Sequence, residues 1–328
     1  MYHHVSDKTH PSTSVTPEKF KQHMQYLADN EFTVWPLFKT LQYLAKNSPI
    51  PAKTVVLTFD DAYQSVYSEA FPILKKYGWP FTVFVTANYI NESNVNFMSW
   101  QQLREIKKFG GDVGNHSFTH PHFVRQRQNE TNTQWQQRIV TEIQQTQYLL
   151  HKHVGNPIPV VAYPYGEYST SVRQIMSSLN YFGMGQHSGA VSNSTDFQAI
   201  PRFPLATGFD DVESFATKVS AKNLPVTVLS PSDGLVINKN EIPTLTLRLE
   251  PGNYKKEMVR CYTAGQGRIQ TTWIDSDKLI LNVRANKSLD AGRQKYNCTA
   301  PSKSEKDVFY WFSYLWMVLE EDGTWYKE

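Results

Sequence analysis

The sequence predicts an α/β layer fold or a parallel α/β barrel in residues 1–224, followed by a small antiparallel β sandwich in residues 225–328. In the first part, short apolar runs alternate with amphipathic helical patterns, which is typical of parallel strands joined by crossover helices. The pattern changes at Leu224-Pro225, after which strand-like runs and turn signals recur about every ten residues. With 40% hydrophobic residues in a chain of 328, a sizeable core can form.

The elements of the first part follow from local signals. Thr16-Pro17 opens a helix, and Ser99 with Gln102 forms a capping box before a second helix that Gly110 ends. Two further helical patterns cover residues 139–150 and 172–179. The strand-like runs between the helices are residues 55–59, 81–85, 112–114, 160–163 and 181–185.

The second part contains the two cysteines of the chain, Cys261 and Cys298. Two free thiols would suit a cytosolic protein, but two cysteines confined to one short β-rich stretch favour a disulfide and an oxidising compartment. The strand-like runs here are residues 226–229, 245–249, 279–283 and 308–312.

The aromatic residues of this second part have two interpretations. Their rings either stack on sugars, as in a carbohydrate-binding module, or fill the core of the sandwich, which the sequence favours. Both faces of residues 309–314 are aromatic, so we expect one face to pack against the first part. The tryptophans concerned are Trp273, Trp311, Trp316 and Trp325.

Charge and hydropathy exclude several partners. The chain has 33 Lys+Arg against 30 Asp+Glu and no run of more than two basic residues, which argues against nucleic acid or an acidic membrane surface. No apolar run approaches the roughly 18 residues of a membrane span. The opening residues 1–5 read like the middle of a strand, so we expect an export segment upstream and an extracytoplasmic location (periplasmic, cell-surface or secreted). No feature specifies an oligomeric state.

Polar residues that can perform chemistry follow four of the strand-like runs. They are Asp60-Asp61, His116 with His120, residues 163–166, and Gln186-His187. In a parallel α/β barrel these strand ends share one face, where catalytic residues gather. Taken singly, an Asp-Asp pair is usually a helix cap or turn, and a pair of histidines at this spacing usually lies on a solvated face.

The spacing of His116 and His120 places both imidazoles on one face if this segment forms a helical turn. With Asp61 they make a set of two nitrogens and one carboxylate that leaves positions open for water and substrate, as in catalytic metal sites. Asp60 is then free to act as a base on the water, whose pKa the metal lowers toward ~7. His122, close by, is expected to be a surface histidine in a loop.

Thr58-Phe59-Asp60-Asp61 and residues 116–120 (His-Ser-Phe-Thr-His) resemble the first two motifs of the NodB-type polysaccharide deacetylases, carbohydrate esterase family 4, and Tyr163-Pro164-Tyr165-Gly166 resembles the third. The resemblance covers about residues 1–210. It implies a distorted (β/α) barrel that removes N-acetyl groups from sugar polymers through one divalent metal. In this family Asp60 would be the base and the backbone N–H of Tyr165 an oxyanion donor. The metal ligands would be Asp61, His116 and His120.

Two departures from the family pattern bear on the site. The arginine that usually steadies the catalytic aspartate is replaced by Ala162; Arg202 is the candidate substitute, and an ordinary surface arginine is the alternative. The late motif with a catalytic histidine is not evident. Instead, residues 2–7 and 14–20 resemble the branch that deacetylates the poly-β-1,6-N-acetylglucosamine of biofilms. That likeness makes His3 the general acid, with His187 as the competing choice; either could also be a polar strand-end residue.

The sequence therefore favours a metal-dependent hydrolase that acts on an N-acetylated polysaccharide. One alternative is a deacetylase that removes O-acetyl groups or that acts on chitin or peptidoglycan. The others are a glycan-binding protein on an inactive barrel and a glycosidase that uses Asp60 and Asp61. The ligand types favour Zn²⁺ and also suit Co²⁺, Ni²⁺ or Mn²⁺.

Overall fold

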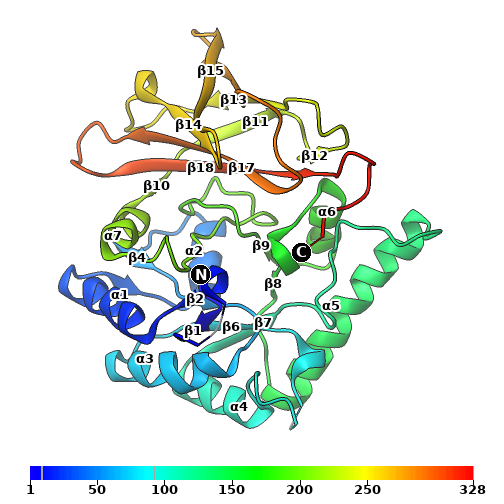
Figure 1. Ribbon diagram of the computed structural model, residues 1–328. Coiled ribbons are helices and arrows are strands. Elements are labelled where there is room, and N and C mark those ends of the chain that lie inside the picture. The colour runs from blue at the N-terminus through cyan, green and yellow to red at the C-terminus, as the bar shows by residue number, and fades with distance from the viewer. Residues whose placement is uncertain (9, 92, 328) are drawn as a thin grey trace.

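The computed structural model describes residues 1–8, 10–91 and 93–327. Within these residues, the first part of the chain is built on a five-stranded parallel sheet in the order β5-β6-β7-β8-β9. Two short parallel pairs, β1 with β2 and β3 with β4, accompany it, so the strands form curled sheets of the half-barrel type (Figure 1). The strands are β1 His4–Val5, β2 Ser14–Val15, β3 Thr33–Val34, β4 Thr54–Val55, β5 Thr58–Phe59, β6 Thr82–Val85, β7 Asp112–Asn115, β8 Val160–Ala162 and β9 Phe182–Met184.

The helices begin and end largely where the local signals predict. The Thr16 side chain caps α1, the Ser99–Gln102 capping box opens α4, and Gly110 ends α4 with a φ of 106°. The α-helices are α1 Pro17–Asp29, α2 Leu37–Ala45, α3 Phe71–Tyr77, α4 Trp100–Phe109, α5 Asn132–Val154, α6 Thr170–Ser178 and α7 Val212–Ser220. Shorter helical turns are η1 Pro11–Thr13, η2 Val66–Ala70, η3 Ala87–Tyr89, η4 Pro164–Gly166 and η5 Lys256–Met258.

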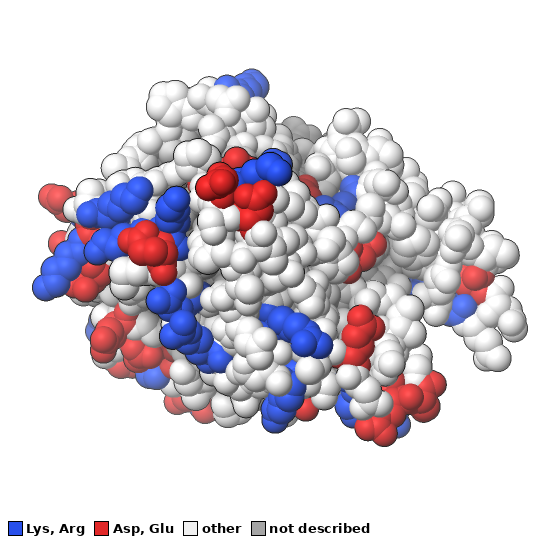
Figure 2. Space-filling view, turned by 90° about the horizontal axis from the view of Figure 1, so that it is seen from above, with Lys and Arg blue, Asp and Glu red and all other residues white. Residues whose placement is uncertain are grey.

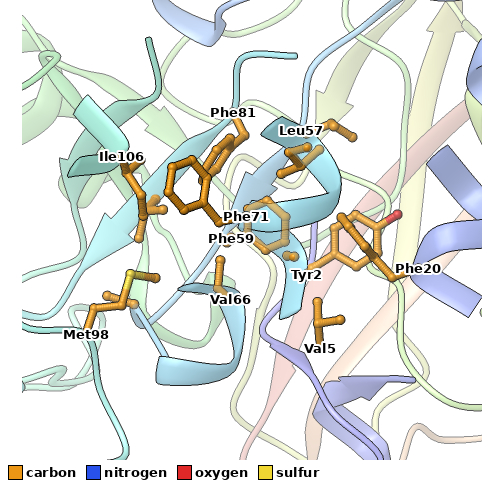
Figure 3. Packing of buried hydrophobic residues seen from close by; sticks show 14 of the residues in the cluster. Tyr2, Val5, Phe20, Leu57, Phe59, Val66, Phe71, Phe81, Met98 and Ile106 are labelled. Carbon is orange, nitrogen blue, oxygen red and sulfur yellow. The ribbon is translucent and has the colours of Figure 1, made fainter. Parts of the chain in front are cut away.

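A row of aromatic rings forms the centre of the first core. Figure 3 shows Phe71, Phe81, Phe59, Tyr2 and Phe20 in succession, with neighbouring ring centroids 5.1–5.8 Å apart. Full burial of one such ring contributes about 1.5–3 kcal/mol. The row joins α1 and α3 to β5 and to the N-terminal residues, so it fixes the start of the chain beside the end of β5.

The last third of the chain forms a nine-stranded sheet that folds over itself, counted within the described residues. The first residues of β15 pair with β14 and the remainder pair with β16, so β15 passes from one layer to the other around a common core. The strands are β10 Lys222–Asn223, β11 Val226–Ser230, β12 Leu235–Val236, β13 Thr244–Leu249, β14 Arg260–Thr263, β15 Gly267–Asp275, β16 Ile280–Arg284, β17 Gly292–Pro301 and β18 Phe309–Val318. The sheet already begins at residue 222, where β10 pairs with β18.

The expected disulfide is confirmed. Cys261 on β14 and Cys298 on β17 are directly opposite each other in the sheet and are bonded. Trp316 is buried in the core of the sandwich, whereas Trp311 packs edge-on against Phe203 of the first part at 5.2 Å. Trp273 is the most accessible of the tryptophans named above, with 36% of its surface exposed.

The surface carries charges of both signs. On the face seen in Figure 2, Lys and Arg are interspersed with Asp and Glu. Among the helices that the structure describes, none combines the length and the apolar character needed to span a bilayer.

Candidate active site

The three predicted metal ligands converge at the carboxyl ends of β5 and β7. Asp61 Oδ1 lies 3.3 Å from His116 Nε2 and 3.5 Å from His120 Nε2, and the ligand atoms of the three residues all lie within 4.8 Å of one another. Asp61 and His116 are buried, and His120 is partly buried. Because the carboxyl ends of parallel strands meet at one edge, residues 55 positions apart in the sequence come together here.

The expectation of a helical turn at residues 116–120 was wrong. The segment is a loop in which Ser117 and His120 adopt left-handed backbone conformations, with φ of 67° and 59°. The loop folds around the carboxylate of Glu142 on α5, which accepts hydrogen bonds from the backbone N–H groups of Phe118 (2.9 Å) and Thr119 (2.8 Å). This buried acceptor, and not an i,i+4 helical spacing, brings the two histidines to one side.

The chemistry of this donor set fits a divalent metal ion. His116 Nδ1 donates to the carbonyl of Ala162 at 2.8 Å, so in the neutral ring Nε2 is the nitrogen that carries the free lone pair. That Nε2 is buried and has no hydrogen-bond partner among the described residues. Burial lowers the pKa of His120 to about 4, helped by the charge of His116, so His120 is neutral. Burial alone would raise the pKa of Asp61, but the interaction with His116 outweighs the effect of burial. The pKa of Asp61 therefore falls well below its usual value. Burial alone would lower the pKa of His116, but the neighbouring Asp61 and Asp60 carboxylates raise it overall. An ionised carboxylate and neutral imidazoles are the states that bind a metal, so a metal at this site would take the place of the proton on His116 Nε2.

Asp60, next to the candidate metal ligands, is held by Arg202. The guanidinium donates two parallel hydrogen bonds to the carboxylate, at 2.7 and 2.8 Å, and a third to the carbonyl of Gly185 at 2.9 Å. The side chain of Asp60 is 0% exposed and that of Arg202 is 4% exposed, so Arg202 is not a surface residue. Burial would raise the pKa of Asp60, but the charge of Arg202, that of His116 and the hydrogen bonds lower it overall. The carboxylate is therefore ionised and fixed in direction.

The structure places His3 beside the carboxylates and His187 elsewhere. Tyr2 pairs with the end of β5 through hydrogen bonds to Thr58 and Asp60, which brings the next residue, His3, to the site. Burial lowers the pKa of His3, against the charges of Asp60 and Asp61.

His187 instead packs against Tyr168, with ring centroids 5.3 Å apart. It lines a cavity of about 390 Å³ between the first part and the sandwich. Burial lowers the pKa of His187 to about 3, and the charges of Lys295 and Arg202 lower it further. Neither Asp60 nor Asp61 contributes to this shift.

Tyr165 lies at the rim of the candidate metal site. Its ring meets His120 edge-on at 4.6 Å and stacks on His122 at 3.8 Å, with 7° between the ring planes. Its backbone is left-handed, with a φ of 58°, a conformation that costs a residue other than glycine about 1–2 kcal/mol. The surroundings must therefore hold this residue in place.

Near the rim, one expectation is corrected and two buried acids, Glu142 and Glu167, were missed by the sequence analysis. His122 is not a surface histidine: its side chain is 17% exposed, and Nδ1 lies 2.8 Å from the fully buried carboxylate of Glu167. Glu142 and Glu167 are both buried acids that organise site loops. No local pattern distinguishes them from exposed glutamates; the position of Glu167 just after the Tyr163–Gly166 motif was the only available signal.

The comparisons with known proteins agree with this geometry. The sequence model of the family described as "Polysaccharide deacetylase" matches residues 47–183. The poly-beta-1,6-N-acetyl-D-glucosamine N-deacetylase of Staphylococcus epidermidis is 30% identical over 196 residues, which cover 58% of this chain and 67% of that protein. The Escherichia coli K12 enzyme of the same name is 24% identical over 254 residues, but the match covers only 38% of its length.

Solved structures show the same fold. The Streptococcus pyogenes deacetylase PplD in complex with acetate aligns with a TM-score of 0.60 and 24% identity, over 67% of this chain and 96% of that one. IcaB from Ammonifex degensii aligns with a TM-score of 0.57 and 23% identity, over 67% and 93%. From the motifs, the metal-ligand cluster and these matches, we conclude that the chain belongs to the polysaccharide deacetylase family, the NodB-type carbohydrate esterases of family 4.

Proposed function

We propose that this protein removes N-acetyl groups from a polymer of β-1,6-linked N-acetylglucosamine. The observation that carries the proposal is the pairing of the buried Asp60–Arg202 ion pair with the Asp61, His116 and His120 cluster. The names of the staphylococcal and E. coli relatives support the choice of polymer.

A divalent ion at Asp61, His116 and His120 would polarise the acetyl carbonyl and lower the pKa of a coordinated water. Zn²⁺ is our first choice for this donor set, and Co²⁺, Ni²⁺ and Mn²⁺ are the alternatives.

Each remaining role follows from the position of the residue. Asp60 is ionised, and Arg202 occupies both of its oxygens from one side, so its free lone pairs can accept a proton from the attacking water. His3, beside the same carboxylates, acts in its protonated form as the general acid and donates a proton to the nitrogen of the departing amine. The backbone N–H of Tyr165 stabilises the negative charge that develops on the acetyl oxygen.

The other activities fit this arrangement less well. A glycosidase needs two carboxyl groups on either side of the scissile bond, about 5–9 Å apart. Here Asp60 is bound to Arg202 and Asp61 faces the two histidines, so the pair is committed to different partners. An inactive, glycan-binding barrel is disfavoured because Asp60, Asp61, His116 and His120 are all present. The Cys261–Cys298 disulfide supports an extracytoplasmic location.

Acetate release tests the proposal. The substrates are N-acetylglucosamine oligomers with β-1,6 or β-1,4 linkages and an O-acetyl ester, each assayed after chelation and after addition of Zn²⁺, Co²⁺, Ni²⁺ or Mn²⁺. We expect metal-restored release from the β-1,6 oligomer. In Asp60→Asn it should fall by a factor on the order of 10²–10⁴, while Asp277→Asn, at an exposed turn, should behave as the wild type.

Three results would contradict the proposal. Unchanged activity in Asp60→Asn would remove the assigned base. Preference for β-1,4 oligomers or for the ester would replace the proposed substrate. New reducing ends in place of acetate would indicate a glycosidase.

A further inference from the structure

The C-terminal end of the chain returns to the rim of the active site. After β18 the chain runs down from the sandwich toward the first part (Figure 1). Tyr326, near this end, is only 5% exposed, and its hydroxyl donates a hydrogen bond to Glu167, 159 positions earlier in the sequence. Arg125 clamps this segment: it donates to the Tyr326 carbonyl at 3.0 Å, and its guanidinium lies over the rings of Trp325 and Tyr326.

Glu167 joins the two parts of the protein. Its carboxylate is fully buried, and it pairs with His122 through Oε2 and with Tyr326 through Oε1. Arg125 and Arg293 lie 3.6 and 3.9 Å from Oε1. A buried carboxylate is tolerated only with such partners, and two of these four, Tyr326 and Arg293 of β17, come from the C-terminal third.

The contacts continue from Glu167 to the proposed oxyanion donor. His122, held by Glu167, stacks flat on Tyr165, and the guanidinium of Arg293 lies 5.4 Å from the centre of the same ring. Tyr165 in turn touches the metal ligand His120. The ring of Tyr165, whose backbone is strained, is thus contacted both by His122 and by Arg293 of the sandwich.

We propose that the C-terminal region completes the active site, with Tyr326 and Arg293 as positioning residues that hold the loop of Tyr165 beside the metal ligands. The role of Tyr165 in catalysis rests on the proposed function. Burial and the charge of Glu167 both raise the pKa of Tyr326. The Tyr326 hydroxyl therefore keeps its proton and remains a hydrogen-bond donor. On this proposal the C-terminal region acts on the chemical step, through the position of Tyr165.

The test uses the full chain with Tyr326→Phe and Arg293→Ala. The matched control is Tyr262→Phe, since Tyr262 is a tyrosine on β14 that is 41% exposed. The measurements are kcat and KM on the polymer that the wild type deacetylates, Zn²⁺ affinity by titration, and hydrogen exchange of the peptide that covers residues 163–168.

We expect kcat to fall by about tenfold or more in both variants, because a small displacement of a group that stabilises the transition state has an effect on this order. KM and Zn²⁺ affinity should stay within about threefold of the wild type. Exchange at residues 163–168 should become faster in the variants and remain unchanged in Tyr262→Phe.

Wild-type kcat in both variants would overturn the inference. A raised KM with unchanged kcat would also overturn it, and would assign the C-terminal region to glycan binding. If the wild type releases no acetate from any substrate, the proposed function fails, and exchange at residues 163–168 then decides the inference separately: equal exchange in all four proteins overturns it, and faster exchange in the two variants supports it.

Discussion

Removing Arg202 should destabilise the protein, because its guanidinium neutralises the buried carboxylate of Asp60. In Arg202→Met, Asp60 remains buried and loses both charge-assisted hydrogen bonds, at 2.7 and 2.8 Å. Breaking such a pair from one side costs about 3–5 kcal/mol. Arg202→Lys keeps the charge but cannot make two parallel bonds, so we expect a loss of about 2 kcal/mol, near the value of one charge-assisted hydrogen bond.

The double variant separates the ion pair from simple packing. When Asp60→Asn accompanies Arg202→Met, no unpaired charge is left, and the double variant should be more stable than the sum of the single changes predicts. We expect a coupling of at least about 2 kcal/mol between the two positions.

Urea denaturation of the four proteins, followed by circular dichroism, measures this coupling. Arg268→Met, at an exposed position on β15, is the control and should change the unfolding free energy by no more than about 0.5 kcal/mol. A coupling below about 0.5 kcal/mol would mean that the two side chains act independently, and would refute the reasoning. Acetate release should fall in Arg202→Met as well, since burial then raises the pKa of Asp60 without opposition from Arg202.

Three further predictions concern the rest of the protein. His3→Ala should lower kcat by a factor on the order of 10²–10⁴ with little change from His187→Ala; the reverse order in an acetate assay would exchange their roles. Burial lowers the pKa of His23 from 6.5 to about 4, so its contribution to stability is complete above pH 6.5 and is lost as the pH falls from 6.5 to 4. Between pH 7.5 and pH 5, the free energy of unfolding measured with urea should therefore fall by about 2 kcal/mol less in His23→Gln than in the wild type. Equal decreases in the two proteins would contradict this. Replacing both Cys261 and Cys298 by alanine should cost about 4 kcal/mol on the chain-entropy estimate for a loop of 37 residues; a change below about 1 kcal/mol on the same assay would show that the loop is constrained without the disulfide.

Local patterns determined much of this protein. The cap at Thr16 and the capping box at Ser99 are made by residues close in sequence, so the helices they start could be placed from the sequence alone. The same holds for the polar residues at strand ends. Because β5 and β7 belong to one parallel sheet, Asp61 and His116 had to meet at its carboxyl edge.

The tertiary structure decided which distant residues complete the site. Local sequence cannot show that Arg202 reaches Asp60 across 142 positions, or that Tyr326 reaches Glu167 across 159, because such contacts depend on strand order and on the path of the loops. The same reason explains the error at residues 116–120, where a buried glutamate on α5 replaced helical spacing as the organising contact. The sequence alone determined which chemistry the strand ends can perform. Only the packing of the whole chain decided how the charges are paired and which histidine lies beside them, since the energy of a buried charge depends on all of its neighbours.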